Sequence, residues 1–351
     1  MHISAFDYDL PPELIAQEPA RPRDASRMLV LRRRGGEAEH RRFRDLPTLL
    51  EPDDVVVLND TRVIRARLRG RREPGGGKAE VLLLSARADG VWEALVTPGR
   101  RIQPGREIVF GGGELRAEVV ERTPDGGRLL RFRTAGGSAD SNDVPAVLER
   151  LGEVPLPPYI HASPADEHDY QTIYADVPGA SAAPTAGLHF TPDMLAAVRA
   201  RVHAVVSLTL HVGLGTFRPI HTEEVEDHTM HAERYAISES TAEVVTSALA
   251  EGRRIVAVGT STARALEAAA AGGGVRAGGV RAGGGETDLF IRPGYEFQVV
   301  GALLTNFHMP RSSLLVLISA FAGRDEVLRA YREAVTLRYR FLSFGDAMLI
   351  L

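Results

Sequence analysis

The stretch between about residues 66 and 134 is built differently from the sequence on either side, and this contrast constrains the fold most. Within it, short runs of β-forming residues recur roughly every ten residues, separated by turns such as PGGG and PDGG. These runs span residues 79–85, 91–96, 107–110, 115–121 and 128–134. No helical period appears before residues 144–151. The pattern predicts a small all-β domain, a barrel or a sandwich, over residues 66–155.

On both sides of this stretch, helix-like and strand-like patterns alternate, which is typical of an α/β domain. A continuous β-branched run at residues 54–58 predicts a buried strand, and it stops at Asn59 and Asp60. After residue 156 we expect strands at 204–210, 254–259 and 314–321, and helices at 193–201, 240–251, 261–270 and 324–337. We therefore predict an α/β main domain, residues 1–65 plus 156–351, interrupted by the small all-β, barrel-like domain.

Composition narrows the class of protein. Hydrophobic residues make up 44% and charged residues 25%, which is typical of a globular chain with a sizeable core. The net charge of −4 argues against a uniformly basic nucleic-acid coat, and the absence of cysteine excludes disulfides and thiolate chemistry. The N-terminal sequence lacks the features of a secretory signal, and the longest apolar run, 314–321, is short for a membrane span. We expect a cytoplasmic protein.

Four stretches in the second half of the chain combine polar residues with Gly, Pro and Thr in a way that core packing does not require. They read APTAGLHFTPDM at 183–194, TLHVGLGTF at 209–217, GETDLFIRPGY at 285–295 and LTNFHMPRS at 304–312. Sites built on loops at strand ends do use such residues. With NDTR at 59–62, they predict one polar pocket assembled from distant parts of the chain.

Two histidines, His189 and His211, are candidates for general acid–base chemistry, because imidazole accepts and donates protons near neutral pH. The alternative is a core histidine that only satisfies its own hydrogen bonds. The nearby Gly187 and Gly215 favour a site, since glycine lets a ligand approach the backbone closely.

Acidic residues near strand ends form a second group of candidates. Asp60 and Arg62 follow the strand at 54–58, where open α/β sheets bind ligands; an ordinary Asx turn is the alternative. Glu286 and Asp288 are two residues apart, so on a strand they face the same way and can bind a ribose or a cation. A solvated sheet edge is the alternative for this pair.

The densest positive run in the chain consists of the arginines at 62, 65, 67, 69, 71 and 72. Arg65, Arg67 and Arg69 alternate as on one face of a strand, which suits a phosphate backbone; a solvated surface is the alternative. A catalytic metal is disfavoured, because cysteine is absent and His228 and His231 form only a weak pair. There is no Walker A motif and no G-x-G-x-x-G after a strand, although VGTS at 258–261 reads as a strand–turn–helix that can meet an anion.

Longer motifs resemble those of one enzyme family nearly end to end. FDYDLP begins at Phe6, LIAQEPARPRDASRML at Leu14 and LNDTRVIRARL at Leu58, and MHAERY, LLTNFHMPRSSLL and YRFLSFGDAMLI follow in order. The chain resembles the S-adenosylmethionine:tRNA ribosyltransferase-isomerases of queuosine biosynthesis. The resemblance implies an α/β domain with an inserted β-barrel, in agreement with the patterns above.

The resemblance also implies a reaction. The ribosyl part of S-adenosylmethionine is transferred and rearranged onto a 7-aminomethyl-7-deazaguanine base at the wobble position of a tRNA with a GUN anticodon. The products are epoxyqueuosine, adenine and methionine. S-adenosylmethionine is then a consumed substrate, no cofactor or metal is needed, and a monomer is expected.

The implied chemistry suggests roles for the candidates. His189 or His211 would transfer protons, with Asp60 and Glu233 as the next candidates. The substrate pocket would be lined by Asn59, Arg62, Thr185, Gly187, Gly215, Glu286, Asp288, Asn306 and His308. The phosphates of tRNA would be contacted by Arg65, Arg67 and Arg69. Two alternatives stay open: a metal-dependent hydrolase that uses the histidines, and an RNA-binding module whose pocket is structural.

Overall fold

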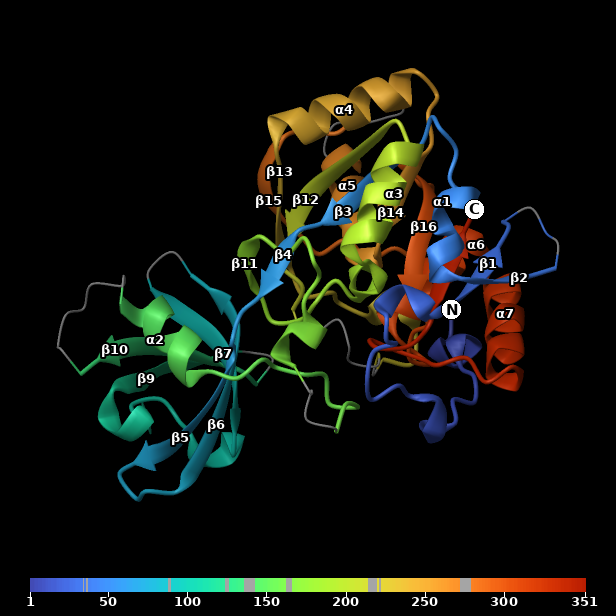
Figure 1. Ribbon diagram of the computed structural model, residues 1–351. Coiled ribbons are helices and arrows are strands. Elements are labelled where there is room, and N and C mark those ends of the chain that lie inside the picture. Colours follow the sequence, from blue (N-terminus) through green and yellow to red (C-terminus); the bar gives the residue numbers. More distant parts are fainter. Residues whose placement is uncertain are drawn as a thin grey trace. The chain divides into compact units, whose positions relative to one another are not determined.

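The structure is a computed structural model, and it describes residues 1–33, 35, 37–87, 90–123, 126–135, 143–161, 166–213, 220, 222–271 and 279–351. Contacts between residues divide the chain into two compact units (Figure 1). The sheet unit comprises Met1–Thr61, Pro158–Val177 and Ala183–Leu351. The barrel unit comprises Arg62–Pro157 and Pro178–Ala182. The predicted fold class, α/β with a small barrel-like all-β part, is confirmed.

Within the described residues, the sheet unit has nine strands in the order β15-β13-β12-β3-β14-β16-β17-β1-β2. Their bounds are β1 Arg27–Leu31, β2 Glu39–Arg42, β3 Val55–Asn59, β12 Ala204–Leu210, β13 Glu233–Ile237, β14 Ile255–Val258, β15 Gly283–Thr287, β16 Val300–Asn306 and β17 Ala347–Ile350. At the centre, β12, β3, β14 and β16 are adjacent and parallel to one another. Parallel strands are covered on both faces, which is why β3 reads as a continuous apolar run and is buried throughout.

The described helices of the sheet unit are α1 Leu46–Leu49, α3 Pro192–Arg201, α4 Glu239–Ala250, α5 Thr260–Ala271, α6 Ser313–Ala322 and α7 Arg324–Thr336. α3 begins where the sequence predicts, because the Thr191 side chain accepts a hydrogen bond from Met194 N at 3.2 Å and Pro192 occupies the first turn. α1 and α3 pack on the sheet face that carries Val56 and Val256, and α5 contacts β3, β12, β14 and β16.

Short 3-10 turns complete the described secondary structure of both units. They span Ile3–Phe6, Pro12–Leu14, Arg23–Ala25, Phe43–Asp45, Gly99–Arg101, Gly111–Gly113, Glu167–Tyr170, Thr185–His189 and Val225–Asp227.

The segment 314–321 is not the predicted strand. It lies within helix α6, which Ser312 caps by accepting a hydrogen bond from Leu315 N at 3.2 Å. All residues of α6 except Ala320 are buried. A short helix that is buried all round has no amphipathic period, so its sequence resembles a buried strand.

The barrel unit is a closed barrel with strand order β10-β7-β6-β5-β8-β9. The strands are β5 Arg67–Glu73, β6 Lys78–Ala86, β7 Val91–Thr97, β8 Glu107–Phe110, β9 Leu115–Arg122 and β10 Arg128–Thr134, followed by helix α2, Asp143–Leu151. Alternate strand residues such as Leu68, Val81 and Ala117 fill the interior. The barrel predicted from evenly spaced β runs is confirmed. Strands β4 (Thr61–Val63) and β11 (Val177–Ala180) form a separate two-stranded sheet.

Over the part of the chain that the structure describes, no helix has the length and apolar character that crossing a membrane requires.

Candidate active site

Four polar or glycine-rich segments converge because four parallel strands end at one edge of the sheet. Asn59 ends β3, His211 follows β12, Gly259 follows β14 and Asn306 ends β16. Since β12, β3, β14 and β16 are adjacent and parallel, their carboxyl ends lie side by side. Open α/β sheets bind ligands in the crevice at this edge.

A cleft opens at this edge, and its empty space, counted out to the open mouth, is about 700 Å³. The lining is drawn from the turn at Thr185–His189, the start of β13, the first turn of α5, the end of β16 and the segment around residues 342–343. The predicted site residues in the lining are Thr185, Glu233, Asn306 and His308. The lining combines apolar side chains with a few polar ones, which is typical of clefts that bind small molecules.

Glu233 supplies a fixed carboxylate to the cleft wall. It is buried at the start of β13, where its Oε1 accepts a hydrogen bond from Gly213 N at 2.8 Å. Its other oxygen, Oε2, pairs with the guanidinium of Arg264, which is also buried. Arg264 in turn donates to the carbonyl of Leu289 at 3.0 Å. The buried ion pair holds the carboxylate in one orientation beside the cleft.

The turn between β14 and α5 forms another part of the wall. Gly259 has a φ of 97°, a conformation that favours glycine, and its N–H donates to Leu304 O at 2.8 Å. Ser261, two residues on, lines the cleft and accepts a hydrogen bond from Asn59 Nδ2 at 3.1 Å. Asn59 itself is fully buried and also donates to Leu210 O at 2.9 Å. Asn59 therefore ties β3 to β12 and supports the turn, without lining the cleft.

Asn306 links the cleft to a buried histidine. Its side-chain oxygen accepts a hydrogen bond from Thr185 Oγ1 at 3.2 Å. Its Nδ2 lies 3.2 Å from His189 Nε2, so Nε2 is the acceptor and the ring proton lies on Nδ1, which contacts Ser26 Oγ at 2.9 Å. Both ring nitrogens of His189 are thus engaged, and His189 is not part of the cleft lining.

The surroundings of His189 keep its ring neutral. The ring stacks on Phe43 at a centroid distance of 5.0 Å and is almost completely buried. Burial, with the nearby positive charges of Arg340 and Arg23, lowers the pKa of His189 to about 3. A neutral ring with a fixed tautomer orients Asn306 and, through it, Thr185.

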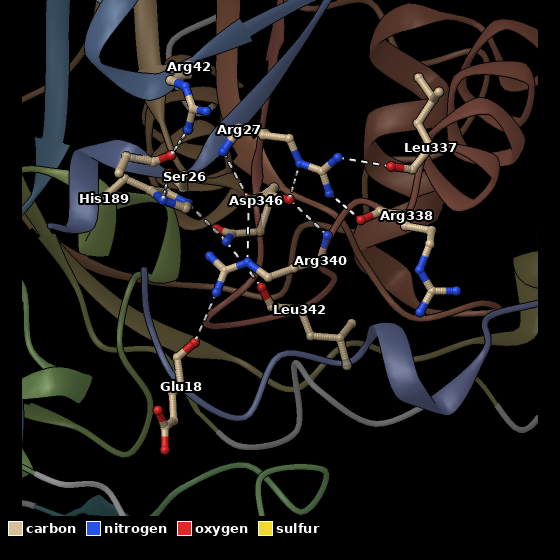
Figure 2. Close-up of polar contacts among 12 residues, drawn as sticks. Glu18, Ser26, Arg27, Arg42, His189, Leu337, Arg338, Arg340, Leu342 and Asp346 are labelled. Carbon is tan, nitrogen blue, oxygen red and sulfur yellow. Dashed lines mark hydrogen bonds and ion pairs between the residues drawn. The ribbon is translucent and has the colours of Figure 1, made fainter. Parts of the chain in front are cut away.

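A strained turn near the C-terminus closes this side of the cleft. Leu342 lines the cleft with a φ of 69°, unusual for a branched residue, and its carbonyl accepts a hydrogen bond from Asn306 Nδ2 at 3.2 Å. Figure 2 shows Asp346 between Arg27 and Arg340. The buried Asp346 accepts from the backbone N–H of Arg27 at 2.9 Å and of Arg340 at 2.8 Å. Asp346 therefore fixes the turn that presents Leu342 and Ser343.

His308 lines the cleft just after β16. Its Nε2 contacts Thr305 Oγ1 at 2.8 Å, and its backbone N–H donates to the hydroxyl of Tyr331 at 2.9 Å. Burial lowers the pKa of His308 to about 3, so this ring is also neutral near pH 7.

His211 and Asp60 lie at the ends of β12 and β3 but outside the cleft lining. His211 Nδ1 contacts Thr61 Oγ1 at 2.8 Å, and Asp60 accepts a hydrogen bond from Thr209 at 2.6 Å. Burial and the charge of Arg234 lower the pKa of His211, while Asp60 opposes this change. Each residue thus bonds to a threonine on the segment that carries the other, and the two separate contacts fasten the strand ends.

Other predicted residues lie elsewhere. A Cβ at Gly187 would approach the Tyr174 hydroxyl to 2.0 Å, so glycine here is required by internal packing. Glu286 and Asp288 are both exposed, and Glu286 pairs with Arg234 at 3.3 Å. Gly215 lies outside the described residues.

The predicted phosphate contacts belong to the barrel unit. Arg62 is exposed, Arg65 donates to Gly152 O at 3.2 Å, Arg67 donates to Leu156 O at 3.2 Å, and Arg69 pairs with Glu153 at 3.0 Å. Arg65 and Arg67 therefore donate to carbonyls of the barrel unit. Arg62 and Arg69 are exposed, and the charge of Arg69 is offset by Glu153.

The site also contains residues that the motifs did not single out, above all Arg264 and Ser261. Ser261 is the last residue of VGTS at 258–261 and Arg264 comes three residues later; the strand–turn–helix pattern of this segment was visible in the sequence. Among the described residues, no group of three or more His, Cys, Asp or Glu is arranged to hold a metal ion.

Comparison with known proteins points to one family. A family model described as "Queuosine biosynthesis protein" matches residues 3–350. Proteins named S-adenosylmethionine:tRNA ribosyltransferase-isomerase from Moorella thermoacetica and Symbiobacterium thermophilum are 55% and 53% identical to the chain over 351 residues, with 100% of each chain covered. The crystal structure of an S-adenosylmethionine tRNA ribosyltransferase from Thermotoga maritima covers 99% of the chain at 40% identity, with a TM-score of 0.56.

Proposed function

The chain belongs to the queuosine biosynthesis protein family, and on this premise we propose that it is an S-adenosylmethionine:tRNA ribosyltransferase-isomerase. It transfers the ribosyl part of S-adenosylmethionine to 7-aminomethyl-7-deazaguanine at the wobble position of tRNA with a GUN anticodon. The ribosyl group is isomerised in the process to give epoxyqueuosine, and adenine and methionine are released.

This proposal rests on two observations. Relatives with this name are 55% and 53% identical to the chain over its full length, and a polar cleft lies at the strand ends. A ribosyl group has several hydroxyls, which need hydrogen-bond partners while the ring opens and recloses. Thr185, Ser261, Asn306 and Ser343 offer hydroxyl and amide groups within one lining.

The reaction needs a base, because the sulfonium acidifies the adjacent ribose carbon and that carbon must lose a proton. We assign this role to Glu233, the candidate from the sequence whose carboxylate lies in the cleft wall. Its pairing with Arg264 holds the carboxylate in one orientation. His189 acts as a positioning residue for Asn306, since the ring has no free nitrogen with which to reach a substrate.

The neutral ring of His308 supports the proposal in a different way. The cleft also contains the Arg264 cation, whose charge Glu233 offsets. A protonated His308 would add a positive charge and repel the sulfonium of S-adenosylmethionine, whereas the buried ring stays uncharged near pH 7. The chemistry proceeds without a cofactor or metal, the protein acts as a monomer, and its place of action is the cytoplasm, where tRNA is modified.

The experiment incubates the protein with S-adenosylmethionine and a tRNA that carries the 7-aminomethyl-7-deazaguanine base, then measures free adenine and the mass of the anticodon nucleoside. The proposal predicts adenine release matched by a gain in nucleoside mass, unchanged by EDTA. Activity that disappears with EDTA would favour a metal-dependent hydrolase. Tight tRNA binding with no consumption of S-adenosylmethionine would favour an RNA-binding module.

A further inference from the structure

The barrel unit has a positive net charge, whereas the rest of the chain has a negative one. Residues 62–157 hold 17 Lys and Arg against 13 Asp and Glu, a formal charge of +4, whereas the whole chain has 42 against 46, a charge of −4. The residues outside 62–157 therefore sum to −8. Segregation of charge on this scale produces a local field that attracts polyanions.

A groove on the barrel unit concentrates this charge. It contains about 1320 Å³ of space open to solvent and is bordered by β5, the β5–β6 hairpin and the turns that follow β7 and β8. Its charged lining consists of Arg69, Arg71, Arg72, Lys78, Glu73 and Glu80. We call it the barrel groove.

The two carboxylates of the barrel groove are matched by arginines that do not line it. Glu73 pairs with Arg116 at 2.8 Å, and Glu80 lies 3.8 Å from Arg67. By contrast, Arg71 and Lys78 have no ion-pair partner in the described part of the chain, and both are exposed. The barrel groove is therefore left with uncompensated positive charge.

Strand pairing makes this arrangement unfavourable for the barrel itself. In the antiparallel pair β5–β6, Arg71 lies directly opposite Lys78. Like charges at directly opposed positions destabilise a sheet. A structural role for the pair is thus difficult to see, whereas an anion placed between the two side chains would relieve the repulsion.

Arg72 adds an unsatisfied donor to the same place. Its Nε is buried without a hydrogen-bond partner among the described residues. The hairpin accommodates its guanidinium because residue 77 is glycine, where a Cβ would lie 1.9 Å from Arg72 Nη2. The guanidinium is held at the hairpin with donor capacity that the protein does not use.

We propose that the barrel groove binds the sugar–phosphate backbone of RNA, with Arg71, Arg72 and Lys78 as phosphate contacts. Guanidinium and ammonium groups pair with phosphate oxygens, and several unpaired cations along one groove suit a polyanion. The described lining holds no aromatic side chain, so bases do not stack there and recognition is independent of sequence. Only the choice of tRNA as the RNA rests on the proposed function.

The test measures binding of an unmodified tRNA transcript to the full-length protein by fluorescence anisotropy over a range of salt concentrations. The groove variant is Arg71→Gln/Lys78→Gln, and the matched control is Arg122→Gln/Arg131→Gln, which removes two exposed charges from the same barrel outside the groove. Loss of two phosphate contacts should weaken binding on the order of 30-fold at about 0.1 M salt and reduce the slope of log K against log salt by about 1.5. The control should bind within a few-fold of wild type.

Folding does not confound this comparison, because all four residues are exposed, and removal of the Arg71–Lys78 repulsion should leave the melting temperature equal or higher. If the groove variant binds as wild type does, or if both variants lose affinity equally, the proposal is overturned. The transcript does not react, so the outcome is separate from that of the proposed function. If the groove variant loses binding but the separate assay, with tRNA that carries the 7-aminomethyl-7-deazaguanine base, shows no adenine release, the enzyme activity is refuted and the groove assignment stands.

Discussion

Acidification should destabilise the protein through two buried histidines. Burial holds the pKa values of His189 and His308 at about 3, whereas a histidine in an unfolded chain titrates near 6.5. Between these values the unfolded chain binds protons that the folded chain does not bind. The free energy of unfolding is therefore fully retained above about pH 6.5 and decreases as the pH falls toward 3. From pH 7 to pH 5, each histidine should cost about 2 kcal/mol.

Urea unfolding followed by circular dichroism at pH 7 and at pH 5 measures this contribution. In His189→Gln and in His308→Gln, the decrease in unfolding free energy between the two pH values should be smaller than in wild type by about 2 kcal/mol. His203→Gln, at an exposed position, is the matched control. Each variant is compared with itself at two pH values, so a general loss of stability cancels. Equal pH dependence in wild type and both variants would refute the assignment of buried, neutral rings.

Three further substitutions have defined outcomes. Glu233→Gln should lower the rate of adenine release by about 10²–10⁴-fold with S-adenosylmethionine binding retained. In Glu286→Gln, on the adjacent strand, the rate should stay near that of wild type. Equal rates in the two variants would show that Glu233 takes no part in the chemistry. Gly187→Ala should lower the free energy of unfolding by about 1–3 kcal/mol, since its Cβ would lie 2.0 Å from the Tyr174 hydroxyl, and an unchanged urea midpoint would contradict that packing. Asp346→Asn should cost about 2 kcal/mol, because a buried carboxylate between two half-exposed arginines is lost, and a neutral result would show that it does not hold the turn.

Local patterns predicted most of the fold. The β runs between residues 79 and 134 became barrel strands, because Gly- and Pro-rich turns mark each reversal of the chain. The helices predicted at 193–201 and 240–251 are present as α3 and α4, and Thr191 and Ser238 cap them. The segment 314–321 was assigned wrongly, since burial on all sides removes the period that distinguishes a helix from a strand. The cap at Ser312 was the signal that could have identified the helix.

The sequence predicted where the site lies better than it predicted which side chains form it. The strand-end motifs around Asn59 and Asn306 do converge, because parallel strands bring their carboxyl ends together. Which side chain reaches the cleft was not predictable, since that depends on tertiary contacts. His189 looks like an acid–base residue in sequence, yet its hydrogen bonds to Ser26 and Asn306 occupy both ring nitrogens. Arg264 lies within an alanine-rich helix, and its role in the site depends on its ion pair with Glu233, which is 31 residues away in the sequence.

The most direct test of the central claim follows the carbon atoms of S-adenosylmethionine. The protein is given S-adenosylmethionine labelled with carbon-13 throughout the ribose, together with tRNA that carries the 7-aminomethyl-7-deazaguanine base, and the anticodon nucleoside is analysed by mass spectrometry. The account predicts that every ribose carbon appears in the modified nucleoside, with unlabelled adenine and methionine in equal amounts. A nucleoside that gains only an unlabelled methyl group, or none of the ribose label, would contradict it.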